Sequence, residues 1–452
     1  MLSFAQQQLW LVDQINPGTA AYNVPYPILI RGALNFEALQ ASLTEIVARH
    51  EAIRTLFLNY KGRPLPVLPK QWQIPIARTD LQHIAKADRE AELRRLLKTE
   101  GARPFNLASD VKLRATLHQI EKHEYVFHHV SHHISWDLRS KIVFYQELGV
   151  LYEAFCAGKP SPLPELPIQY GDYAVWQRSL FEHNLSEQLT SFWVTNLSGA
   201  PPYIEMPTDF PRPSTQSFRG AKHAIRLSAK LLEDVRLRCV DCKVTYYMML
   251  LAAFKILLFC YTGQEDIVIG SPFAARPPKT EKLIGVFVNT LVVRSKVQET
   301  LTFREVMTRV RDATLAALAH QDLPFEKIVE VVRPPRDPSR NALFQINFRV
   351  QGNALVQLNL LGLDTQMLAA ADNDCSKFDL AVEMPSSADS VGFFEYNTSL
   401  FERSTIECMA QHFDELLHEL VAHSDVPLHS VHSFKKMRRQ FEERRVPALH
   451  VV

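Results

Sequence analysis

The segment EYVFHHVSHHISWD, residues 124–137, combines a β-rich run with adjacent histidines. Its aromatic and β-branched side chains predict a strand over residues 124–131. Successive strand residues point to opposite faces, so one ring of His132 and His133 can face the interior and the other a cavity. If the strand ends at this pair and the chain turns back, Asp137 returns toward the rings. Because imidazole exchanges protons near neutral pH, the pattern indicates an acid–base site at one of the two histidines.

The density of histidines before this point raises the question of a metal site. Six of them lie between residues 117 and 133: His118, His123, His128, His129, His132 and His133. Neighbouring rings on a strand point to opposite faces, and the spacing offers no helical i, i+4 pair of ligands. We therefore predict that no metal binds here.

The rest of the chain alternates helical and β-rich segments. Hydrophobic spacing predicts helices at residues 35–50, 88–100, 303–320 and 404–422, and a buried helix at 244–261 between Thr245 and Gly263. Short β-rich runs occupy residues 26–30, 266–269, 291–295, 343–350 and 391–396. This mixture predicts an α/β or α+β fold. A chain of 452 residues exceeds one core, and the proline-rich connection at 158–167 predicts a lobe boundary near residue 165.

Composition excludes several classes of function. The 50 Lys and Arg residues balance 49 Asp and Glu residues, so we predict no nucleic-acid partner. The apolar stretch 244–261 is interrupted by Lys255 and is short for a membrane span, so no membrane association is expected. Residues 1–6 lack the basic region and apolar core of a signal peptide. Six scattered cysteines indicate a reducing compartment, which predicts a cytoplasmic protein.

The histidine segment also carries a resemblance to a known family. Residues 132–137, HHISWD, resemble the HHxxxDG signature of chloramphenicol acetyltransferase and of the condensation domains of nonribosomal peptide synthetases. Further condensation-domain motifs follow in the family's order: 2–10 (LSFAQQQLW, like SxAQxxLW), 49–57 (RHEAIRTLF, like RHExLRTxF), 170–176 (YGDYAVW, like YxDYAxW), 284–290 (IGVFVNT, like IGxFVNT), 320–326 (HQDLPFE, like HQDxPFE) and 336–343 (RDPSRNAL, like RDxSRxxL). The resemblance therefore covers nearly the whole chain.

This resemblance implies two chloramphenicol-acetyltransferase-like lobes in a V-shaped pseudo-dimer with a central tunnel. With our boundary, residues 1–165 form the N-terminal lobe with the HHxxxD motif and residues 166–452 form the C-terminal lobe. The implied reaction is amide formation between a carrier-bound donor acyl or polyketide thioester and the amine of a carrier-bound aminoacyl thioester. Both substrates ride on phosphopantetheine arms of carrier proteins, so no directly bound cofactor is expected. Neighbouring adenylation and polyketide synthase domains are the further partners implied.

The family match also implies roles for individual residues. His133 is expected to take the proton of the attacking amine, which makes it the catalytic residue. His132 is expected to be structural. Asp137 is expected to pair with Arg276 across the lobes, and such a buried pair would hold the geometry of the site.

Three more positions belong to the predicted site. Ser140 and Asn289 are expected at the substrate tunnel or at the interface of the lobes. Leu138 stands where the family has glycine. Glycine at such a turn permits a positive φ or the close approach of a substrate arm, and leucine opposes both.

The resulting HHxxxDxxS form leaves alternatives open. It is similar to that of condensation-type domains in fungal polyketide–peptide hybrid synthases and of some domains that release the chain by intramolecular cyclisation. Epimerisation domains also carry it, although residues 284–290 and 320–326 are condensation-like. A non-catalytic domain that docks a carrier protein or recruits another enzyme is the alternative from another class.

Overall fold

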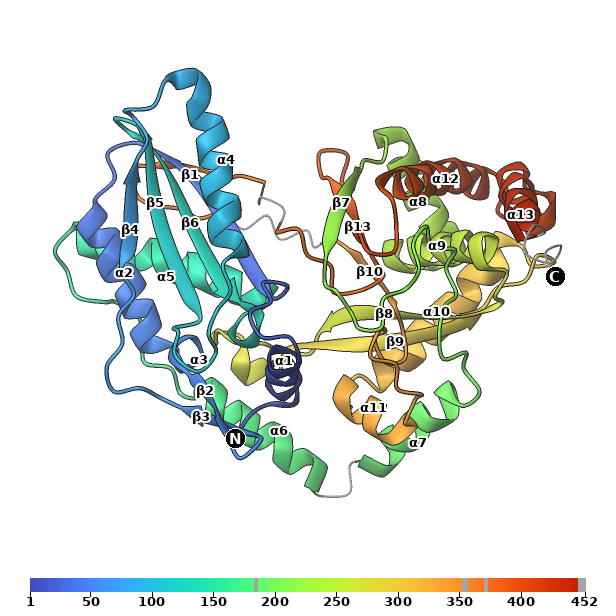
Figure 1. Cartoon of the computed structure of the whole chain (residues 1–452), viewed down its shortest axis with the longest axis horizontal. Helices are drawn as coiled ribbons and strands as arrows, with labels where there is room; N and C mark the ends of the chain where they lie inside the picture. Colours follow the sequence, from blue (N-terminus) through green and yellow to red (C-terminus); the bar gives the residue numbers. More distant parts are fainter. Residues whose placement is uncertain (183–185, 352–356, 370–372, 446–452) are drawn as a thin grey trace. The chain divides into compact units, whose positions relative to one another are not determined.

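The computed structural model describes residues 1–182, 186–351, 357–369 and 373–445, and its contacts divide the chain into two compact units (Figure 1). Unit 1 comprises Met1–Leu185, Ala274–Val288 and Ala354–Asn373, and unit 2 comprises Ser186–Phe273, Asn289–Asn353 and Asp374–Val452. Their bounds are not those of the predicted lobes 1–165 and 166–452, because residues 166–185 and two later segments of the chain belong to unit 1. Each unit combines a sheet with helices, which confirms the predicted α/β class.

Unit 1 is built on a five-stranded sheet with the order β11-β1-β6-β5-β4. Its strands are β1 (Asn23–Arg31), β4 (Ile76–Asp80), β5 (Leu113–Glu121), β6 (Glu124–His132) and β11 (Asp364–Met367). β6 is the central strand and pairs antiparallel with β1 on one side and β5 on the other. The strand predicted at residues 124–131 is therefore confirmed, and its two flanking partners fix where it ends.

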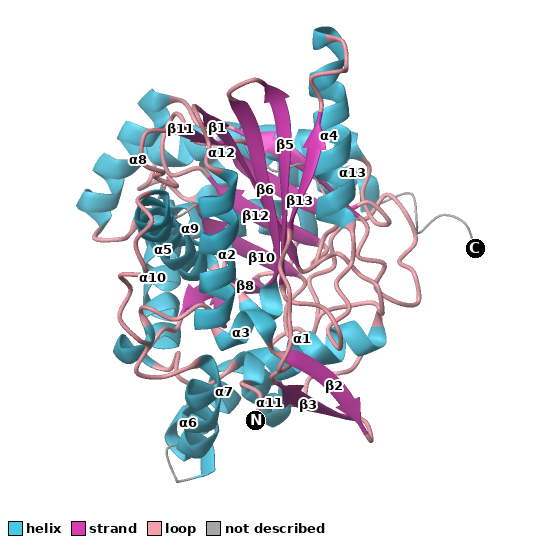
Figure 2. Cartoon of the chain, turned by 90° about the vertical axis from the view of Figure 1, so that its left-hand side faces the viewer, coloured by secondary structure: helices cyan, strands magenta, loops and turns pink. Residues whose placement is uncertain are grey.

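Helices cover both faces of this sheet, as Figure 2 shows for α2 and α4 on opposite sides of β5 and β6. α2 (Phe36–Arg49) and α5 (Leu138–Cys156) pack in one core cluster with Ile28 and Phe127. α4 (Lys86–Ala102) packs in another with Leu29 and Val126. Neighbouring strand residues thus enter opposite cores, as the alternation of side chains along a strand requires. The remaining elements of the unit are α1 (Phe4–Ile15), α3 (Glu51–Arg54), β2 (Leu56–Tyr60), β3 (Arg63–Val67) and α6 (Tyr170–Glu182).

Unit 2 is built on a six-stranded mixed sheet with the order β7-β13-β12-β10-β8-β9. Its strands are β7 (Gly220–Ile225), β8 (Asp266–Ala274), β9 (Val288–Lys296), β10 (Ile346–Val350), β12 (Leu380–Met384) and β13 (Gly392–Asn397). The β-rich runs predicted from the sequence all correspond to strands. β10 begins later than expected, because Leu343 adopts a left-handed backbone conformation with φ 67° that an extended strand does not accommodate.

The core of unit 2 surrounds α9 (Tyr246–Thr262), the buried helix predicted from the sequence. Thr245 caps its N-terminus and Gly263 ends it with a left-handed φ of 70°, as expected. Lys255 is fully buried in its middle, and its Nζ donates to two strand carbonyls and to the Ser295 hydroxyl at 2.9–3.0 Å. Three acceptors therefore accommodate the one lysine in this apolar helix.

The other helices of unit 2 are α7 (Ser186–Leu197), α8 (Ala229–Cys242), α10 (Phe303–Ala319), α11 (Phe325–Val332), α12 (Arg403–Ala422) and α13 (His432–Arg445). The helices predicted near residues 303–320 and 404–422 are thus confirmed, as are those of unit 1 at 35–50 and 88–100. No single helix that the structure describes is long and apolar enough to cross a membrane, and α8 with α9 passes that test only as a pair bent by 102°.

Candidate active site

The two adjacent histidines lie where β6 ends and the 3₁₀-helix η1 (His133–Ser135) begins. His132 is buried, its Nδ1 accepts the Ile134 N–H at 3.1 Å, and its ring meets Phe105 edge-on at 5.8 Å. His133 is partly exposed, and its backbone N–H donates to Tyr22 O at 2.9 Å. The structure therefore buries the His132 ring and leaves His133 partly exposed, with its Nδ1 shielded from solvent.

Asp137 lies four residues after His133 and is the N-cap of α5. Its Oδ1 accepts both the backbone N–H and the hydroxyl of Ser140 at 2.7 Å, and its Oδ2 accepts the Phe287 N–H at 3.1 Å. Arg276 Nη2 bonds both carboxylate oxygens, at 2.9 and 3.1 Å. The side chains of Arg276 and Asp137 are only 8% and 4% exposed. The ion pair predicted from the sequence is therefore present and buried.

Arg276 belongs to Ala274–Val288, a segment that the contacts assign to unit 1. Its Nη1 donates to Thr280 O and Leu283 O, both at 2.7 Å, so the same guanidinium also organises the segment around it. Burial lowers the pKa of Arg276, and the neighbouring Asp137 carboxylate opposes that shift. The pair was expected to join the predicted lobes, whereas both partners lie within one compact unit.

Gly285 brings this segment into close contact with α5 and α6. Its N–H donates to Ser140 Oγ at 3.0 Å, and its carbonyl oxygen lies 2.8 Å from the same Oγ, whose one proton goes to Asp137 or to this carbonyl. The Tyr170 hydroxyl donates to Val286 O at 2.7 Å, and a Cβ added at Gly285 would lie 2.1 Å from the Tyr170 ring. Ser140 is fully buried, so it braces the ion pair from within unit 1.

A second polar cluster contacts the segment Ala274–Val288, and it was not predicted from the sequence. Glu147 of α5 accepts from His50 Nε2 at 2.7 Å and from Arg49 Nε at 3.0 Å. His50 Nδ1 in turn accepts the Ile284 N–H at 3.3 Å, which assigns the ring proton to Nε2. The sequence signal for this cluster was Glu147, an acidic residue on the apolar face of a helix, because a buried charge is almost always paired.

Asn289 lies just past this segment, in unit 2. Its Nδ2 donates to Gln321 O and Leu323 O at 2.8 and 2.9 Å, while its Oδ1 accepts the backbone N–H groups of Phe325 and Thr290 at 3.0 and 2.9 Å. The amide thus uses its two donors and both acceptor positions. Asn289 therefore holds the turn at 320–326 in shape.

Leu138 is the first residue of α5, and its side chain is 50% exposed. Its φ is negative, as the start of a right-handed helix requires. The turn therefore makes no demand for the positive φ that only glycine adopts cheaply. Leucine at this position can therefore oppose a substrate arm only through the space that its exposed side chain occupies beside the site.

Two histidines earlier on β6 lie in the interior of unit 1. His128 and His129 are buried, and His129 Nε2 bonds the Tyr145 hydroxyl at 3.2 Å. Burial lowers the pKa of His128 to about 3 and that of His129 well below its usual value. In the described ranges, no group of three histidine, cysteine or acidic residues is placed to hold a metal ion.

A family model and several known proteins match nearly the whole chain. The family model named condensation domain matches residues 1–441. The chain is 39% identical over 427 residues to one of the linear gramicidin synthase proteins of Brevibacillus parabrevis, and the match covers 94% of this chain and 6% of that protein. It is 40% identical over 408 residues to malpinin synthetase of Mortierella alpina, covering 90% of this chain and 5% of that protein.

Solved structures share the fold over nearly the whole chain. The X-domain from teicoplanin biosynthesis superposes with a TM-score of 0.86 at 25% identity, covering 95% of this chain and 97% of that one. The first condensation domain of the calcium-dependent antibiotic synthetase superposes with a TM-score of 0.79 at 20% identity, covering 96% and 98%.

Two sheet-and-helix units, with a histidine pair at the end of the central strand of the first, form a chloramphenicol-acetyltransferase-like fold. Among proteins with this fold, the chain belongs to the condensation-domain family of the nonribosomal peptide synthetases. Condensation domains are acyltransferases that form amide bonds. The chain spans less than a tenth of the length of the synthetases it matches first, so it corresponds to one part of such proteins.

Proposed function

We propose that this domain forms a peptide bond with His133 as its catalytic base. The observation that carries the proposal is the short turn from His133 to Asp137. The backbone of the partly exposed His133 is held by Tyr22, just before β1, and by η1, and the turn closes on a buried ion pair between Asp137 and Arg276. A base must be held within hydrogen-bonding reach of the proton it takes, and this turn supplies that rigidity.

The proposed step needs no covalent enzyme intermediate. The amine of the acceptor attacks the carbonyl carbon of the donor thioester, a C–N bond forms and the C–S bond breaks. His133 takes the proton of the attacking nitrogen and returns it to the leaving thiolate, so the products are an amide and a free thiol. Asp137 and Arg276 act as positioning residues because both are buried and bonded to each other, and Arg276 Nη1 is also bonded to backbone carbonyls.

The relatives support a proposal for the substrates and partners. Linear gramicidin synthase and malpinin synthetase are much longer than this chain, so further domains of an assembly line would stand beside it. We propose that carrier proteins present donor and acceptor as phosphopantetheine thioesters, with adenylation or polyketide synthase domains as neighbours in the cytoplasm. A polyketide donor is the finer form of this proposal, and it rests on the HHxxxDxxS form of the motif.

A single-turnover assay with loaded donor and acceptor carrier proteins tests the proposal. His133→Ala should lower the rate of amide formation on the order of a hundredfold or more, the usual contribution of a positioned base. The matched control is His123→Ala, an exposed histidine in the turn before the same strand, which should leave the rate unchanged.

Each outcome of that assay assigns one function. Amide formation that is lost in His133→Ala and retained in His123→Ala supports condensation. Product that forms without the acceptor carrier would instead indicate release of the chain by cyclisation. Carrier binding without product from the wild-type domain would indicate a docking or recruiting domain, and equal rates in wild type and His133→Ala would remove His133 from the mechanism.

A further inference from the structure

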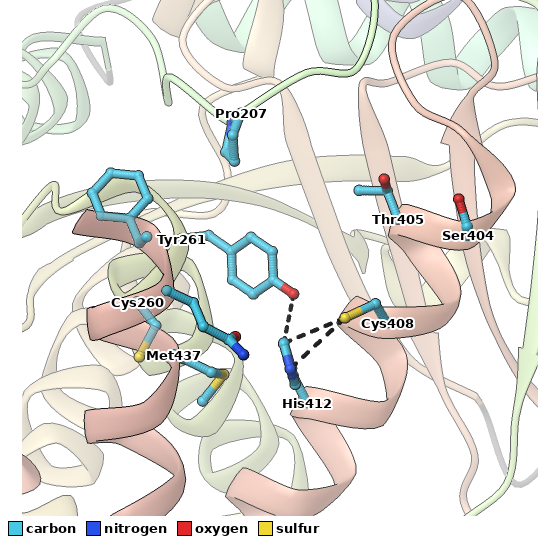
Figure 3. A pocket seen from close by; sticks show the side chains of 10 residues that line it. Pro207, Cys260, Tyr261, Ser404, Thr405, Cys408, His412 and Met437 are labelled. Carbon is cyan, nitrogen blue, oxygen red and sulfur yellow. Dashed lines mark hydrogen bonds between the residues drawn. The ribbon is translucent and has the colours of Figure 1, made fainter. Parts of the chain in front are cut away.

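Unit 2 contains a cavity of about 330 Å³, lined mainly by residues of α9, α12 and α13 (Figure 3). Two of its polar groups bond each other, because the Tyr261 hydroxyl lies 2.8 Å from His412 Nδ1. The polar cluster around His50 in unit 1 is different, since it is bonded to the segment Ala274–Val288. This cluster is therefore connected to the candidate active site by hydrogen bonds.

One peptide group links His50 to Arg276. Its N–H, which belongs to Ile284, donates to His50 Nδ1 at 3.3 Å. Its carbonyl, which belongs to Leu283, accepts from Arg276 Nη1 at 2.7 Å. Ile284 is buried, so losing the imidazole acceptor carries the cost of desolvating an N–H group. Because a peptide group is planar, the acceptor that fixes its N–H also fixes the direction of its carbonyl toward Arg276.

His50 is itself held in place. It is buried at the junction of α2 and α3, where its backbone N–H donates to Ile46 O at 3.0 Å. The side chain of Gln169 bonds the backbone on both sides of it, accepting the Glu51 N–H at 3.2 Å and donating to Arg49 O at 3.0 Å. The imidazole therefore projects from a fixed backbone.

The hydrogen bonds form a chain that begins and ends on α5. Glu147 of α5 accepts from His50 Nε2 at 2.7 Å, which orients the ring so that Nδ1 faces the Ile284 N–H. At the other end, Arg276 Nη2 bonds the carboxylate of Asp137, the N-cap of α5, at 2.9 and 3.1 Å. Hydrogen bonds in such a buried chain strengthen one another. A change at His50 is therefore transmitted to Asp137.

We propose that His50 is a positioning residue for amide formation, acting through its Nδ1 on the peptide group of residues 283 and 284. This role rests on the proposed function, in which His133 is the base and the pair of Asp137 and Arg276 holds its turn. Loss of the Nδ1 acceptor frees the peptide group, loosens Arg276 and lets the turn leave its productive geometry. Because His50 is buried, it acts without touching the substrate, so kcat should fall while KM is kept.

Two substitutions separate the roles of the two ring nitrogens. In His50→Asn, Oδ1 takes the place of Nδ1 and keeps an acceptor for the Ile284 N–H. In His50→Gln, the side-chain amide nitrogen takes the place of the ring Nε2 and keeps the bond to Glu147. A role limited to stability predicts that His50→Gln is the milder change, because it keeps the partner of a buried carboxylate.

Amide formation is measured with loaded carrier proteins at varied concentrations of the acceptor carrier. His50→Gln should lower kcat on the order of tenfold with KM changed by less than about twofold, whereas His50→Asn should keep most of the rate. Hydrogen exchange at the amide of Phe287, which donates to Asp137, follows the turn without any substrate. Exchange there should accelerate in His50→Gln and stay slow in His50→Asn.

Equal kcat values in the two variants, or unchanged Phe287 exchange in His50→Gln, would overturn the proposal. A wild-type domain that forms no amide would remove the proposed function, and the exchange rates would then still decide whether His50 holds the turn. Should His50→Gln lose its thermal unfolding transition, His50→Asn decides alone. A loss of kcat on the order of tenfold in that variant contradicts the role of Nδ1, and a retained rate supports it.

Discussion

The buried pair between Asp137 and Arg276 allows a quantitative prediction. Arg276→Met removes the guanidinium and keeps much of the aliphatic stem. The Asp137 carboxylate then stays buried with three remaining donors, the N–H and hydroxyl of Ser140 and the Phe287 N–H. Removing one member of a buried pair costs about 3–5 kcal/mol, and the three donors place the expected loss near the lower end, about 3 kcal/mol.

Asp137→Asn separates the charge from the helix cap. Asparagine caps a helix about as well as aspartate, so the bond to the Ser140 N–H can survive while the carboxylate charge is lost. The remaining Arg276 is then buried against the carbonyls of Thr280 and Leu283. In the double variant neither charge is left, and its loss of stability should be smaller than the sum of the single losses by about 2 kcal/mol.

Urea unfolding gives the four free energies of this cycle, and hydrogen exchange at the amides of Ser140 and Phe287 follows the local opening, because both donate to Asp137. Exchange at both amides should accelerate in Arg276→Met. The interpretation that this buried ion pair stabilises the site would be refuted by either of two results. One is a loss below about 1 kcal/mol in the free energy of unfolding for Arg276→Met. The other is a double variant whose loss equals the sum of the losses of the two single variants.

Three further predictions follow from single contacts. Gly285→Ala should lower the free energy of unfolding by about 1–3 kcal/mol, because its Cβ meets the Tyr170 ring, whereas Gly171→Ala, with nothing within 4 Å of the new Cβ, should not. Leu138→Gly should cost at most about 1 kcal/mol in urea unfolding and should preserve amide formation, because the residue starts a helix with a negative φ and an exposed side chain; a large loss of turnover would contradict this reading. Burial lowers the pKa of Lys255 from 10.5 to about 7, so between these two pH values the unfolded chain binds more protons than the folded chain, and the stability that this site contributes rises with pH. Lys255→Met should remove this part of the rise in the denaturation midpoint between about pH 7 and about pH 9. An unchanged rise in the variant would contradict the prediction.

Local signals in the sequence predicted fewer than half of the described α-helices and strands. These are α2, α4, α9, α10 and α12 and the strands β1, β6, β8, β9, β10 and β13. Thr245 and Gly263 bound α9 because an N-cap hydroxyl and a left-handed glycine act within a few residues of the helix they end. The helix α5 was not predicted, although Asp137 is an N-cap of the expected type. The motifs were also readable, because they are short runs, and they identified the turn at His133 and the partner Arg276 through their resemblance to a family.

The contacts that hold the site together could not be predicted from local sequence signals. Glu147 meets His50, which lies 97 positions earlier in the chain, and the hydroxyl of Ser140 meets Gly285, 145 positions later. Such contacts depend on how separate elements pack, and no spacing rule relates their sequence positions.

By itself, therefore, the sequence determined the class of fold, the turn that carries His133 and those elements with strong local signals, because caps, periodicity and short motifs act over a few residues. Only the tertiary structure decided that the segment Ala274–Val288 packs within unit 1, and that it brings Arg276 to Asp137 and Gly285 to Ser140. The physical reason is that a buried charge or hydroxyl is tolerated only where partners from distant elements satisfy it, and those partners meet only when the core packs.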